Sequence, residues 1–353
     1  MNISIFSPGI VPPLHYGGTE RVIEWLINEL TAQGNKVYFL GPEGSHVPSA
    51  EKVFYLDFPE ENINAHPIDF RCLIPGDTDI VHIHCATNLD YGYPVLKTVH
   101  GYPFFKEGNF GKREQFDQSY SFVSDAHRRE CGRPENPYVH NGIDLTEYIY
   151  AEDKDDYLLF LGKVDWVFKG LPLAVQIANE TRQNLIIAGD FLDPSFYEKG
   201  LKGILNDRIR YVGPVGGRVK AQLLSRAKAL IFPTVWPEPF GLVAAEAMAS
   251  GTPIITTTKG AMPEVIQQGV TGFTCVTFDE MREAVKLVEQ IKPEACRRHV
   301  EKYFTSRRMA INYQRLYRQI IRRHKMEKGL AALPRGRPLP GQEIDKETCL
   351  GQF

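Results

Sequence analysis

The chain has 353 residues, of which 43% are hydrophobic and 24% charged, and its 41 basic and 43 acidic residues leave a net charge of -2. This length predicts two domains, or one large one, with enough apolar surface for real cores. The balanced charge does not favour a nucleic-acid partner, and none is expected. The six cysteines lie far apart and form no CxxC pair, which argues against a disulfide scaffold or a structural zinc site.

The chain begins with an apolar, strand-like stretch that has no basic region before it and no cleavage site after it, so a cytoplasmic location is expected. No window approaches about 20 consecutive apolar residues, which argues against a membrane-spanning segment. The stretch from Arg297 to Arg337 is strongly basic and would suit peripheral contact with the anionic inner face of a membrane. Ordinary solvation of a helix face would account for the same residues.

Short apolar runs alternate with helical patterns along most of the chain. Strands are predicted for residues 2–6, 36–40, 79–84, 97–99, 157–162, 184–188, 209–212, 229–232 and 253–256. Helices are predicted for residues 19–33, 240–249 and 279–291. This alternation is typical of an α/β fold with parallel sheets, in which ligands bind beyond the carboxyl ends of the strands.

The alternation breaks once, at the polar residues 141–156, where we place a domain boundary. The second half then repeats the architecture of the first, which favours two Rossmann-like units that face each other. We therefore predict a first domain over residues 1–145 and a second over 151–305. Residues 325–353 lose all periodicity and become rich in Gly, Pro and charge, so this tail is predicted to be disordered or foreign to the fold.

The segment PEPFGLVAAEAMASG, residues 237–251, carries the richest chemistry. Glu238 lies in the loop after a predicted strand, and Glu246 follows eight residues later in a helix that begins near Gly241. A helix start presents unpaired N–H groups and a positive dipole end, so it can hold a phosphate without a metal. One carboxylate could then accept hydrogen bonds from sugar hydroxyls while the other reaches a ribose diol. The backbone groups in question belong to Phe240, Gly241, Leu242 and Val243.

Two further motifs suit a diphosphate. Gly17 and Gly18 open the first predicted helix, where small residues let the backbone approach a ligand, although a plain tight turn would explain them equally. Lys163 and Lys169 lie six residues apart in the first strand-to-helix connection of the second half, well placed to converge as cations on a leaving diphosphate.

A metal site is not predicted. His82 and His84 alternate along a strand and so share a face, but no third ligand lies nearby in the sequence. The run from Asp153 to Asp156 contains a D-x-D string, yet it lies in the linker and is better explained as a solvated charge run. No cofactor of any other kind is expected.

The segment PEPFGLVAAEAMASGTPII closely resembles the E-x7-E signature of retaining glycosyltransferases of family four, which have the GT-B fold. Further family elements occur in the same order over roughly residues 1–324: GGTERV, DIVHIH, VHG, SFVSDAHR, VHNGID, LGKVDWVFKG and YFTSRRMAINYQRLY. One residue departs from the pattern, since Lys163 stands where the family usually has Arg. A lysine keeps the charge but loses the bidentate guanidinium fork.

The resemblance implies two facing domains with a cleft between them and a helix over residues 306–324 that crosses back onto the first domain. It implies a retaining, metal-independent hexosyltransferase whose donor is a UDP or GDP sugar and whose acceptor is a carbohydrate, a lipid-linked compound or a small molecule. Retention without a protein nucleophile implies a front-face mechanism in which the leaving phosphate takes the proton of the acceptor.

The resemblance also implies a role for each site residue. His100 and Glu238 should contact the transferred sugar, Lys163 and Lys169 the diphosphate, and Glu246 the ribose. The base pocket should include the turn at Val212, Gly213 and Pro214.

Two rival functions share the architecture. An NAD-dependent dehydrogenase would need a GxGxxG fingerprint after its first strand, and the chain has none there. A non-catalytic sensor of sugar nucleotides would lose the residues at the reaction centre, whereas both His100 and Glu238 are present.

Overall fold

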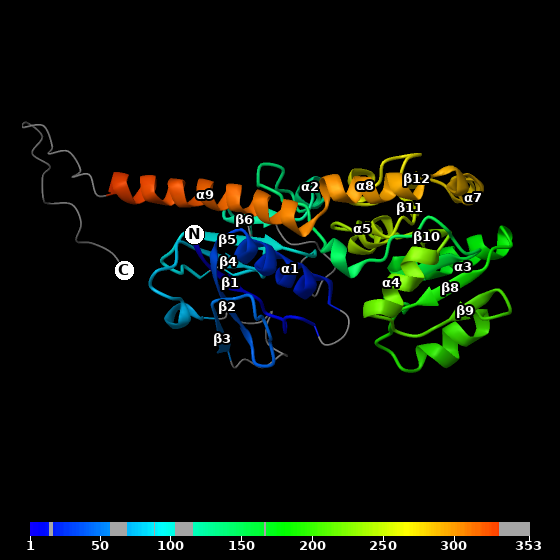
Figure 1. Ribbon diagram of the computed structural model, residues 1–353, viewed down its shortest axis with the longest axis horizontal. Coiled ribbons are helices and arrows are strands. Elements are labelled where there is room, and N and C mark those ends of the chain that lie inside the picture. Colours follow the sequence, from blue (N-terminus) through cyan, green and yellow to red (C-terminus); the bar gives the residue numbers. More distant parts are fainter. Residues whose placement is uncertain (14–16, 57–68, 88, 103–115, 166, 332–353) are drawn as a thin grey trace, which may run out of the picture.

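The computed structural model describes residues 1–13, 17–56, 69–87, 89–102, 116–165 and 167–331, with side chains up to residue 328. Within them, two six-stranded parallel sheets lie side by side, each covered by helices (Figure 1). The first sheet contains β1 (Asn2–Phe6), β2 (Lys36–Pro42), β3 (Lys52–Leu56), β4 (Ile80–Ile83), β5 (Val95–Val99) and β6 (Tyr120–Phe122). The second contains β7 (Leu158–Leu161), β8 (Leu185–Ala188), β9 (Ile209–Tyr211), β10 (Ala229–Phe232), β11 (Ile254–Thr257) and β12 (Gly272–Cys275). The predicted α/β architecture of two Rossmann-like units is confirmed.

Both sheets have the same strand order. The first runs β3-β2-β1-β4-β5-β6, and the second, read from its other edge, runs β9-β8-β7-β10-β11-β12. In each sheet the chain first adds strands toward one edge and then returns to add strands toward the other. The two strands on either side of this switch are β1 and β4 in the first sheet and β7 and β10 in the second. Loops that leave the carboxyl ends of such a pair diverge and open a crevice, so ligands bind there in sheets of this kind.

All nine predicted strands are present, with ends within two residues of their predicted limits. The three strands missing from the prediction, β3, β6 and β12, are edge strands. Edge strands are covered less completely than central ones. The residues of β3 are all exposed or half-buried, and β12 has two half-buried residues. The strand β6 is buried but has only three residues, with a serine in its middle.

The helices pack against the faces of the sheets. They are α1 (Gly18–Ala32), α2 (Asp125–Glu130), α3 (Leu171–Glu180), α4 (Gly217–Arg226), α5 (Leu242–Ala249), α6 (Met262–Val265), α7 (Phe278–Leu287), α8 (Pro293–Tyr303) and α9 (Ser306–Ala331). In α1 the apolar residues Val22, Leu26 and Leu30 form a stripe that is fully buried. This stripe fixes which side of the helix lies on the sheet.

The chain crosses back to the first domain at Thr305. The Ile143 N–H donates to the Phe304 carbonyl and the Ser306 N–H donates to the Ile143 carbonyl, each at 2.9 Å. The crossing strand passes so close to Gly142 that a Cβ there would lie 2.2 Å from the Thr305 carbonyl oxygen, so only glycine fits. Figure 1 shows α9 running from this point over the first domain.

The crossing helix is longer than predicted. It begins at Ser306 but continues to Ala331, seven residues past the predicted end at 324 and into the segment predicted to be disordered. The reason is physical: residues 325–331 hold no proline and a single glycine, so an established helix can simply propagate through them. Residues 332–353 lie outside the described residues.

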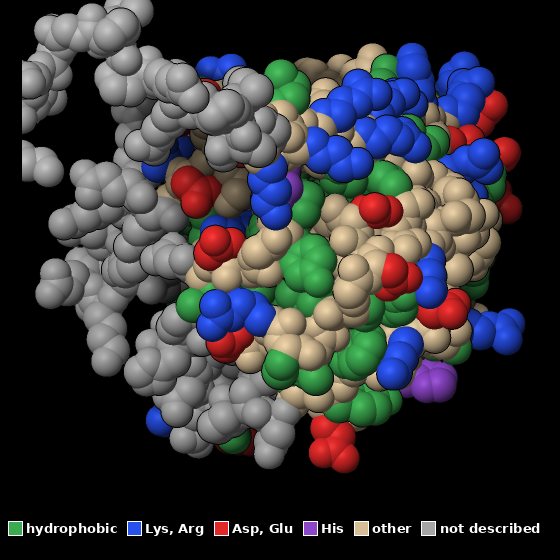
Figure 2. All heavy atoms as spheres, turned by 90° about the vertical axis from the view of Figure 1, so that its left-hand side faces the viewer, with side chains coloured by type: hydrophobic (Ala, Val, Ile, Leu, Met, Phe, Trp, Pro, Cys, Tyr) green, Lys and Arg blue, Asp and Glu red, His purple; other side chains and the backbone are tan. Residues whose placement is uncertain are grey.

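Basic side chains form a stripe on α9. Arg315, Arg318, Arg322 and Lys325 recur at helical spacing and all are exposed. Figure 2 shows Lys and Arg side chains gathered along the top of the molecule, the edge at which Figure 1 places α9. None of the helices in the described part of the chain combines the length and the apolarity that crossing a membrane requires.

A carboxylate of the second domain caps a helix of the first. Glu264, in α6, accepts hydrogen bonds from the backbone N–H groups of Asp125 and Ala126 at the start of α2, and it lies 3.0 Å from His140 Nε2. Burial alone would raise the pKa of the Glu264 carboxyl, but His140 and the two amides outweigh this effect and lower it. The contact therefore helps to hold the two domains in register.

We expect Glu264→Ala to lower the free energy of unfolding by about 2 kcal/mol, because it removes charge-assisted hydrogen bonds from half-buried partners. Urea denaturation would measure this change. The matched control is Glu283→Ala, which removes an exposed ion pair with Lys286 and should cost less than about 0.5 kcal/mol. Equal losses in the two variants would show that the interdomain cap adds no stability.

Candidate active site

The loops after β7 and β10 meet because these strands are neighbours in the second sheet. The Val235 N–H donates to the Phe168 carbonyl at 2.9 Å, and Gly170, with φ of 85°, packs so closely that a Cβ would lie 2.0 Å from the Pro233 carbonyl oxygen. This close packing joins two predicted residues from separate loops. Lys169 Nζ lies 2.8 Å from Glu238 Oε2, and both side chains are only 13% exposed.

The second predicted lysine, Lys163, pairs with a carboxylate that follows the neighbouring strand β8. Lys163 follows β7, and its Nζ lies 3.1 Å from Asp190 Oδ2 at the end of β8. The Lys163 side chain is 9% exposed. An ammonium group that is buried and paired with a carboxylate has a fixed position, which is what stabilisation of an anionic ligand requires. Asp190 was not among the predicted residues, although it follows a predicted strand directly.

The start of α5 is arranged to bind an anion. Gly241 precedes the helix with φ of 85°, and a Cβ there would lie 2.3 Å from Met262 Cε. No described side chain caps this end, and Ala244 is the first residue whose N–H bonds back, to the Gly241 carbonyl. The N–H groups of Leu242 and Val243 therefore point out of the helix end unpaired within it. Phe240 is buried in the core, so it contributes backbone alone.

The glycine pair of the first domain faces this helix start. A Cβ built on Gly18, the first residue of α1, would lie 3.2 Å from the Leu242 side chain. At Gly17 a Cβ would lie 2.5 Å from Pro13 Cβ. Close packing within the first domain thus favours glycine at 17, whereas Gly18 packs against the second domain. The starts of α1 and α5 come together, so their positive dipole ends act on the same space.

Glu246 is the most heavily bonded carboxylate of the site. Its Oε1 accepts from Arg21 at 2.6 Å, from the Tyr148 hydroxyl at 2.9 Å and from Lys220 at 3.0 Å. Its side chain is 3% exposed. Burial alone would raise the pKa of this carboxyl, but Lys220 and Arg21 outweigh that effect and hold the pKa at about 2. All three bonds go to one oxygen, so Oε2 keeps its lone pairs for a ligand.

On the first domain, His100 lies at the carboxyl end of β5. Its Nε2 is 2.8 Å from His84 Nδ1, at the end of the neighbouring β4. Burial, with a smaller effect of His127, lowers the pKa of His100 to about 3, so the ring is neutral at physiological pH. His100 can therefore act as a neutral hydrogen-bonding group, and it has no permanent charge to offer.

Two contacts bring the His100 strand end opposite the Glu238 loop. Ser124 Oγ donates to the Pro239 carbonyl at 2.6 Å. The rings of Tyr102 and Trp236 meet edge to face, with centroids 5.7 Å apart. Tyr102 is two residues after His100, and Trp236 is two residues before Glu238, so the aromatic pair joins these two segments of the two domains.

Gly213, predicted for the base pocket, lies at the end of β9, two strands from β7. It has φ of 82°, and its carbonyl accepts from the Gly189 N–H at 2.9 Å. The adjacent Val212 is 47% exposed, although it is a large apolar residue. An exposed apolar side chain beside a tight turn is suited to contact the face of a ligand base.

The residues considered for metal binding have other partners. His82 uses both ring nitrogens, with the Tyr317 hydroxyl and Thr98 Oγ1 each at 2.7 Å. In the linker, Asp155 pairs with Arg226. Among the residues that the structure describes, no three His, Cys, Asp or Glu side chains are grouped so that they could hold a metal ion.

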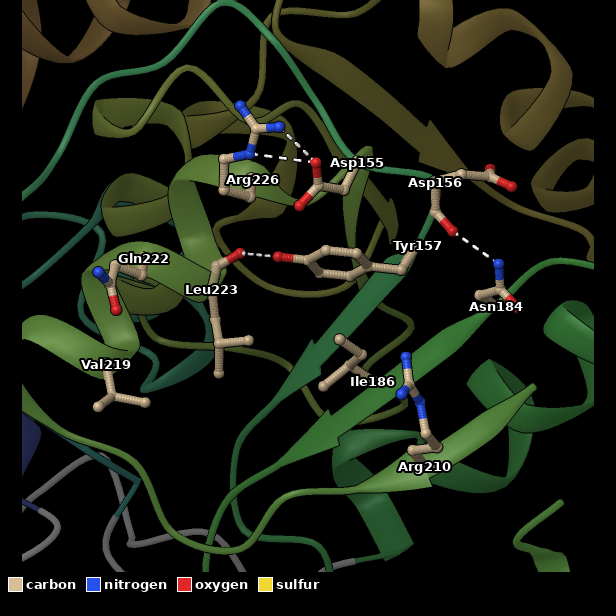
Figure 3. A pocket seen from close by; sticks show the side chains of 10 residues that line it. All are labelled: Asp155, Asp156, Tyr157, Asn184, Ile186, Arg210, Val219, Gln222, Leu223 and Arg226. Carbon is tan, nitrogen blue, oxygen red and sulfur yellow. Dashed lines mark hydrogen bonds and ion pairs between the residues drawn. The ribbon is translucent and has the colours of Figure 1, made fainter. Parts of the chain in front are cut away.

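A hollow of about 530 Å³ lies at the end of the second sheet where its strands begin, opposite the end that carries the candidate site. Its lining includes Tyr157 and Asn184, which precede β7 and β8, and side chains of α4 (Figure 3). Figure 3 shows the Tyr157 hydroxyl directed at the Leu223 carbonyl, to which it donates at 2.8 Å. This hollow is at the amino ends of the strands, away from Lys169 and Glu238, so it is not part of the candidate site.

Several site residues were missing from the prediction: Arg21, His84 as a partner of His100, Tyr148, Asp190, Lys220, Trp236 and Glu264. A signal existed for Arg21, which follows Gly17 by four residues and so shares its helix face. For Tyr148 and Lys220 no local pattern exists, because they meet Glu246 only through the tertiary fold.

We expect Glu246→Gln to destabilise the protein by about 3 kcal/mol at neutral pH, because it leaves Arg21 and Lys220 buried without a counter-charge. The folded-state pKa of Glu246 is lowered from 4.5 to about 2, so this stability is fully present above about pH 5 and disappears as the pH falls towards 2. Unfolding free energies of both proteins across this range would measure it.

The matched control is Glu180→Gln, since Glu180 is exposed and pairs with Arg282 at 3.5 Å. That change should cost less than about 0.5 kcal/mol at any pH. A Glu246→Gln effect that persists unchanged at pH 2 would show that packing, and not the charge, is lost.

Part of the chain matches a known protein family. Residues 155–291 match the family model described as Glycosyl transferases group 1. The phosphatidyl-myo-inositol mannosyltransferase of Mycobacterium tuberculosis is 27% identical over 313 residues, which are 75% of this chain and 81% of that protein. The first curated relatives are matched over 34% to 60% of their own length.

Solved structures share the fold. The chain resembles AviGT4, a glycosyltransferase involved in avilamycin A biosynthesis, with a TM-score of 0.71 and 22% identity over 91% of this chain and 98% of that one. It resembles Anabaena Alr3699/HepE in complex with UDP-glucose with a TM-score of 0.61 and 16% identity over 92% of this chain and 100% of that one. Residues 155–291 thus match the glycosyl transferases group 1 family model, and the two domains have the GT-B fold of these solved glycosyltransferases.

Proposed function

We propose that the protein transfers a hexosyl group from a nucleoside-diphosphate sugar to an acceptor hydroxyl with retention of configuration and without a metal. One observation carries the proposal. Two buried lysines, the carboxylate of Glu238, the uncapped start of α5 and the carboxylate of Glu246 within α5 all lie at the carboxyl end of the second sheet. This set of groups matches the parts of a sugar nucleotide: diphosphate, sugar hydroxyls and ribose. The Alr3699/HepE structure, which has this fold, holds UDP-glucose.

The donor would bind mainly to the second domain. Glu246 would accept hydrogen bonds from the ribose diol through Oε2, since its other oxygen is occupied by three donors. The N–H groups of Leu242 and Val243 would hold the diphosphate, supported by the helix dipole. Lys169 and Lys163 would lie beside it as fixed cations. Glu238, held by Lys169, would bind hydroxyls of the sugar.

The same groups support a front-face reaction. The bond between the anomeric carbon and the phosphate oxygen breaks, and the acceptor oxygen bonds to the anomeric carbon from the same side. The leaving phosphate oxygen takes the proton of the acceptor hydroxyl. Negative charge grows on the diphosphate as the bond breaks, so Lys169, Lys163 and the start of α5 stabilise the transition state more than the ground state. Glu238 needs no nucleophilic role in this scheme.

A panel of sugar nucleotides tests the proposal, with UDP-glucose and GDP-mannose as the first probes and EDTA present throughout. A donor that binds should raise the melting temperature, because at 100 times its Kd it stabilises the folded state by about 2.7 kcal/mol. Slow hydrolysis of the same donor should release its nucleoside diphosphate. If neither UDP nor GDP binds, or if turnover requires an added divalent ion, the proposal is wrong in that part.

Once a donor is known, Lys169→Met should lower kcat by about two orders of magnitude, which corresponds to about 3 kcal/mol of transition-state stabilisation. The affinity for the free nucleoside diphosphate should fall much less, and added magnesium should not restore turnover. Lys163→Arg should keep turnover within about threefold, because the guanidinium preserves the charge.

The matched control for Lys169→Met is Lys202→Met, which removes an exposed lysine of the same domain paired with Glu198. It should leave kcat unchanged. Near-normal turnover in Lys169→Met would mean that the leaving group is stabilised elsewhere.

A further inference from the structure

The histidine motif at the end of β4 is not used by the reaction as proposed, although it lies against a residue that is. His84 is 4% exposed, and its backbone N–H donates to the Phe6 carbonyl at 3.1 Å, which fixes it between β1 and β4. Its ring is stacked on that of His100, with centroids 5.1 Å apart. The 2.8 Å contact from Nδ1 to His100 Nε2 is therefore held from both sides by strand ends.

Both rings are neutral at physiological pH. Burial, together with the neighbouring rings of His82 and His100, lowers the pKa of His84, and burial lowers the pKa of His100 to about 3. A neutral imidazole carries one proton on one of its two nitrogens. In a hydrogen bond between two such rings one nitrogen must donate and the other accept, so each ring dictates the tautomer of its partner.

The surroundings favour one direction of this bond. Among the described residues, His84 Nε2 and His100 Nδ1 are both shielded from water and have no hydrogen-bond partner. If His100 donated, the unpaired N–H would be His84 Nε2–H, on a residue that is 4% exposed. If His84 donates, the unpaired N–H is His100 Nδ1–H, on a residue that is only half-buried at a strand end and so lies nearer to the space in which a ligand would bind.

His84 itself is held in place by a rigid neighbour. The ring of His82 packs on it with centroids 4.1 Å apart. His82 in turn is bonded to Tyr317 of the crossing helix α9 and to Thr98 of β5. Since His82 has both nitrogens occupied, it cannot rotate towards His84 and compete with His100 for the Nδ1 proton.

We propose that His84 is a positioning residue for His100: its Nδ1–H donates to His100 Nε2 and so keeps the single proton of His100 on Nδ1, the nitrogen that donates to a hydroxyl of the bound sugar. This inference rests on the proposed function, in which His100 contacts the transferred sugar. It assigns no charge and no proton transfer to His84, whose effect is exerted through His100.

The first test needs no substrate. Nitrogen-15 spectra of histidine ring nitrogens in the full-length protein at neutral pH distinguish protonated from unprotonated nitrogens, and His100→Asn identifies the signals. His100 should be protonated on Nδ1, and it should remain so in His84→Asn, whose amide nitrogen occupies the place of His Nδ1. In the isosteric His84→Leu the proton should redistribute to Nε2. A wild-type His100 protonated on Nε2 overturns the proposal.

The second test uses kinetics with UDP-glucose as the probe. His84→Leu should lower kcat by about 10- to 100-fold, the range seen when a functional histidine loses the partner that orients it. The Kd for UDP should change less than twofold, and His84→Asn should recover kcat to within about threefold of wild type. Equal losses of kcat in the Asn and Leu variants would mean that His84 only fills space. If the wild type turns over no sugar nucleotide, the proposed function fails, while the spectra still decide the tautomer.

Discussion

One buried carboxylate ties the two halves of the molecule together. Glu246 sits in α5 of the second domain, yet it binds Arg21 from the first domain, Tyr148 from the linker and Lys220 from α4, all through one oxygen. Taking these charges out of water is costly, so the arrangement is stable only when every partner is in place. The relative position of the domains, and with it the shape of the cleft, depends on this cluster. Ribose binding at the remaining oxygen would therefore act at the joint between the domains.

The second constraint on the site is the strand order, which is the same in both sheets. Each sheet reverses between its first and fourth strands, and the candidate residues leave from these reversal points: Gly17 and Gly18 after β1, His84 after β4, Lys163 and Lys169 after β7, and Glu238 after β10. None of these residues needs to be near another in sequence. The topology alone brings each pair of loops together, and the close contact of Gly170 with the Pro233 backbone makes the approach tight enough for side chains to meet.

The sequence predicted central strands and loop chemistry well for a physical reason. Central parallel strands are buried on both faces, so they read as apolar runs bounded by turn residues, and the glutamates and lysines of the site follow these runs directly. Edge strands are buried less completely: every residue of β3 is exposed or half-buried. The site contacts that escaped prediction, such as Arg21 with Glu246 and Glu264 with α2, join residues over 100 positions apart. No local pattern encodes such a contact. The end of α9 was predicted too early because the polar, charged composition after residue 324 suggested disorder, whereas an established helix continues through residues that do not break it.

The two domains bring different kinds of side chain to the candidate site. On the second domain, two lysines are paired with carboxylates and lie where a diphosphate would bind. On the first domain, burial lowers the pKa of His84 and His100, so these two side chains offer only neutral hydrogen bonds at physiological pH. A cationic histidine near the sugar would compete with the lysines for the diphosphate and would oppose positive charge growing at the anomeric carbon. A neutral ring with a fixed tautomer avoids both effects. Because the His100 ring is neutral, it needs no carboxylate as a counter-charge, and a second neutral histidine, His84, can set its orientation.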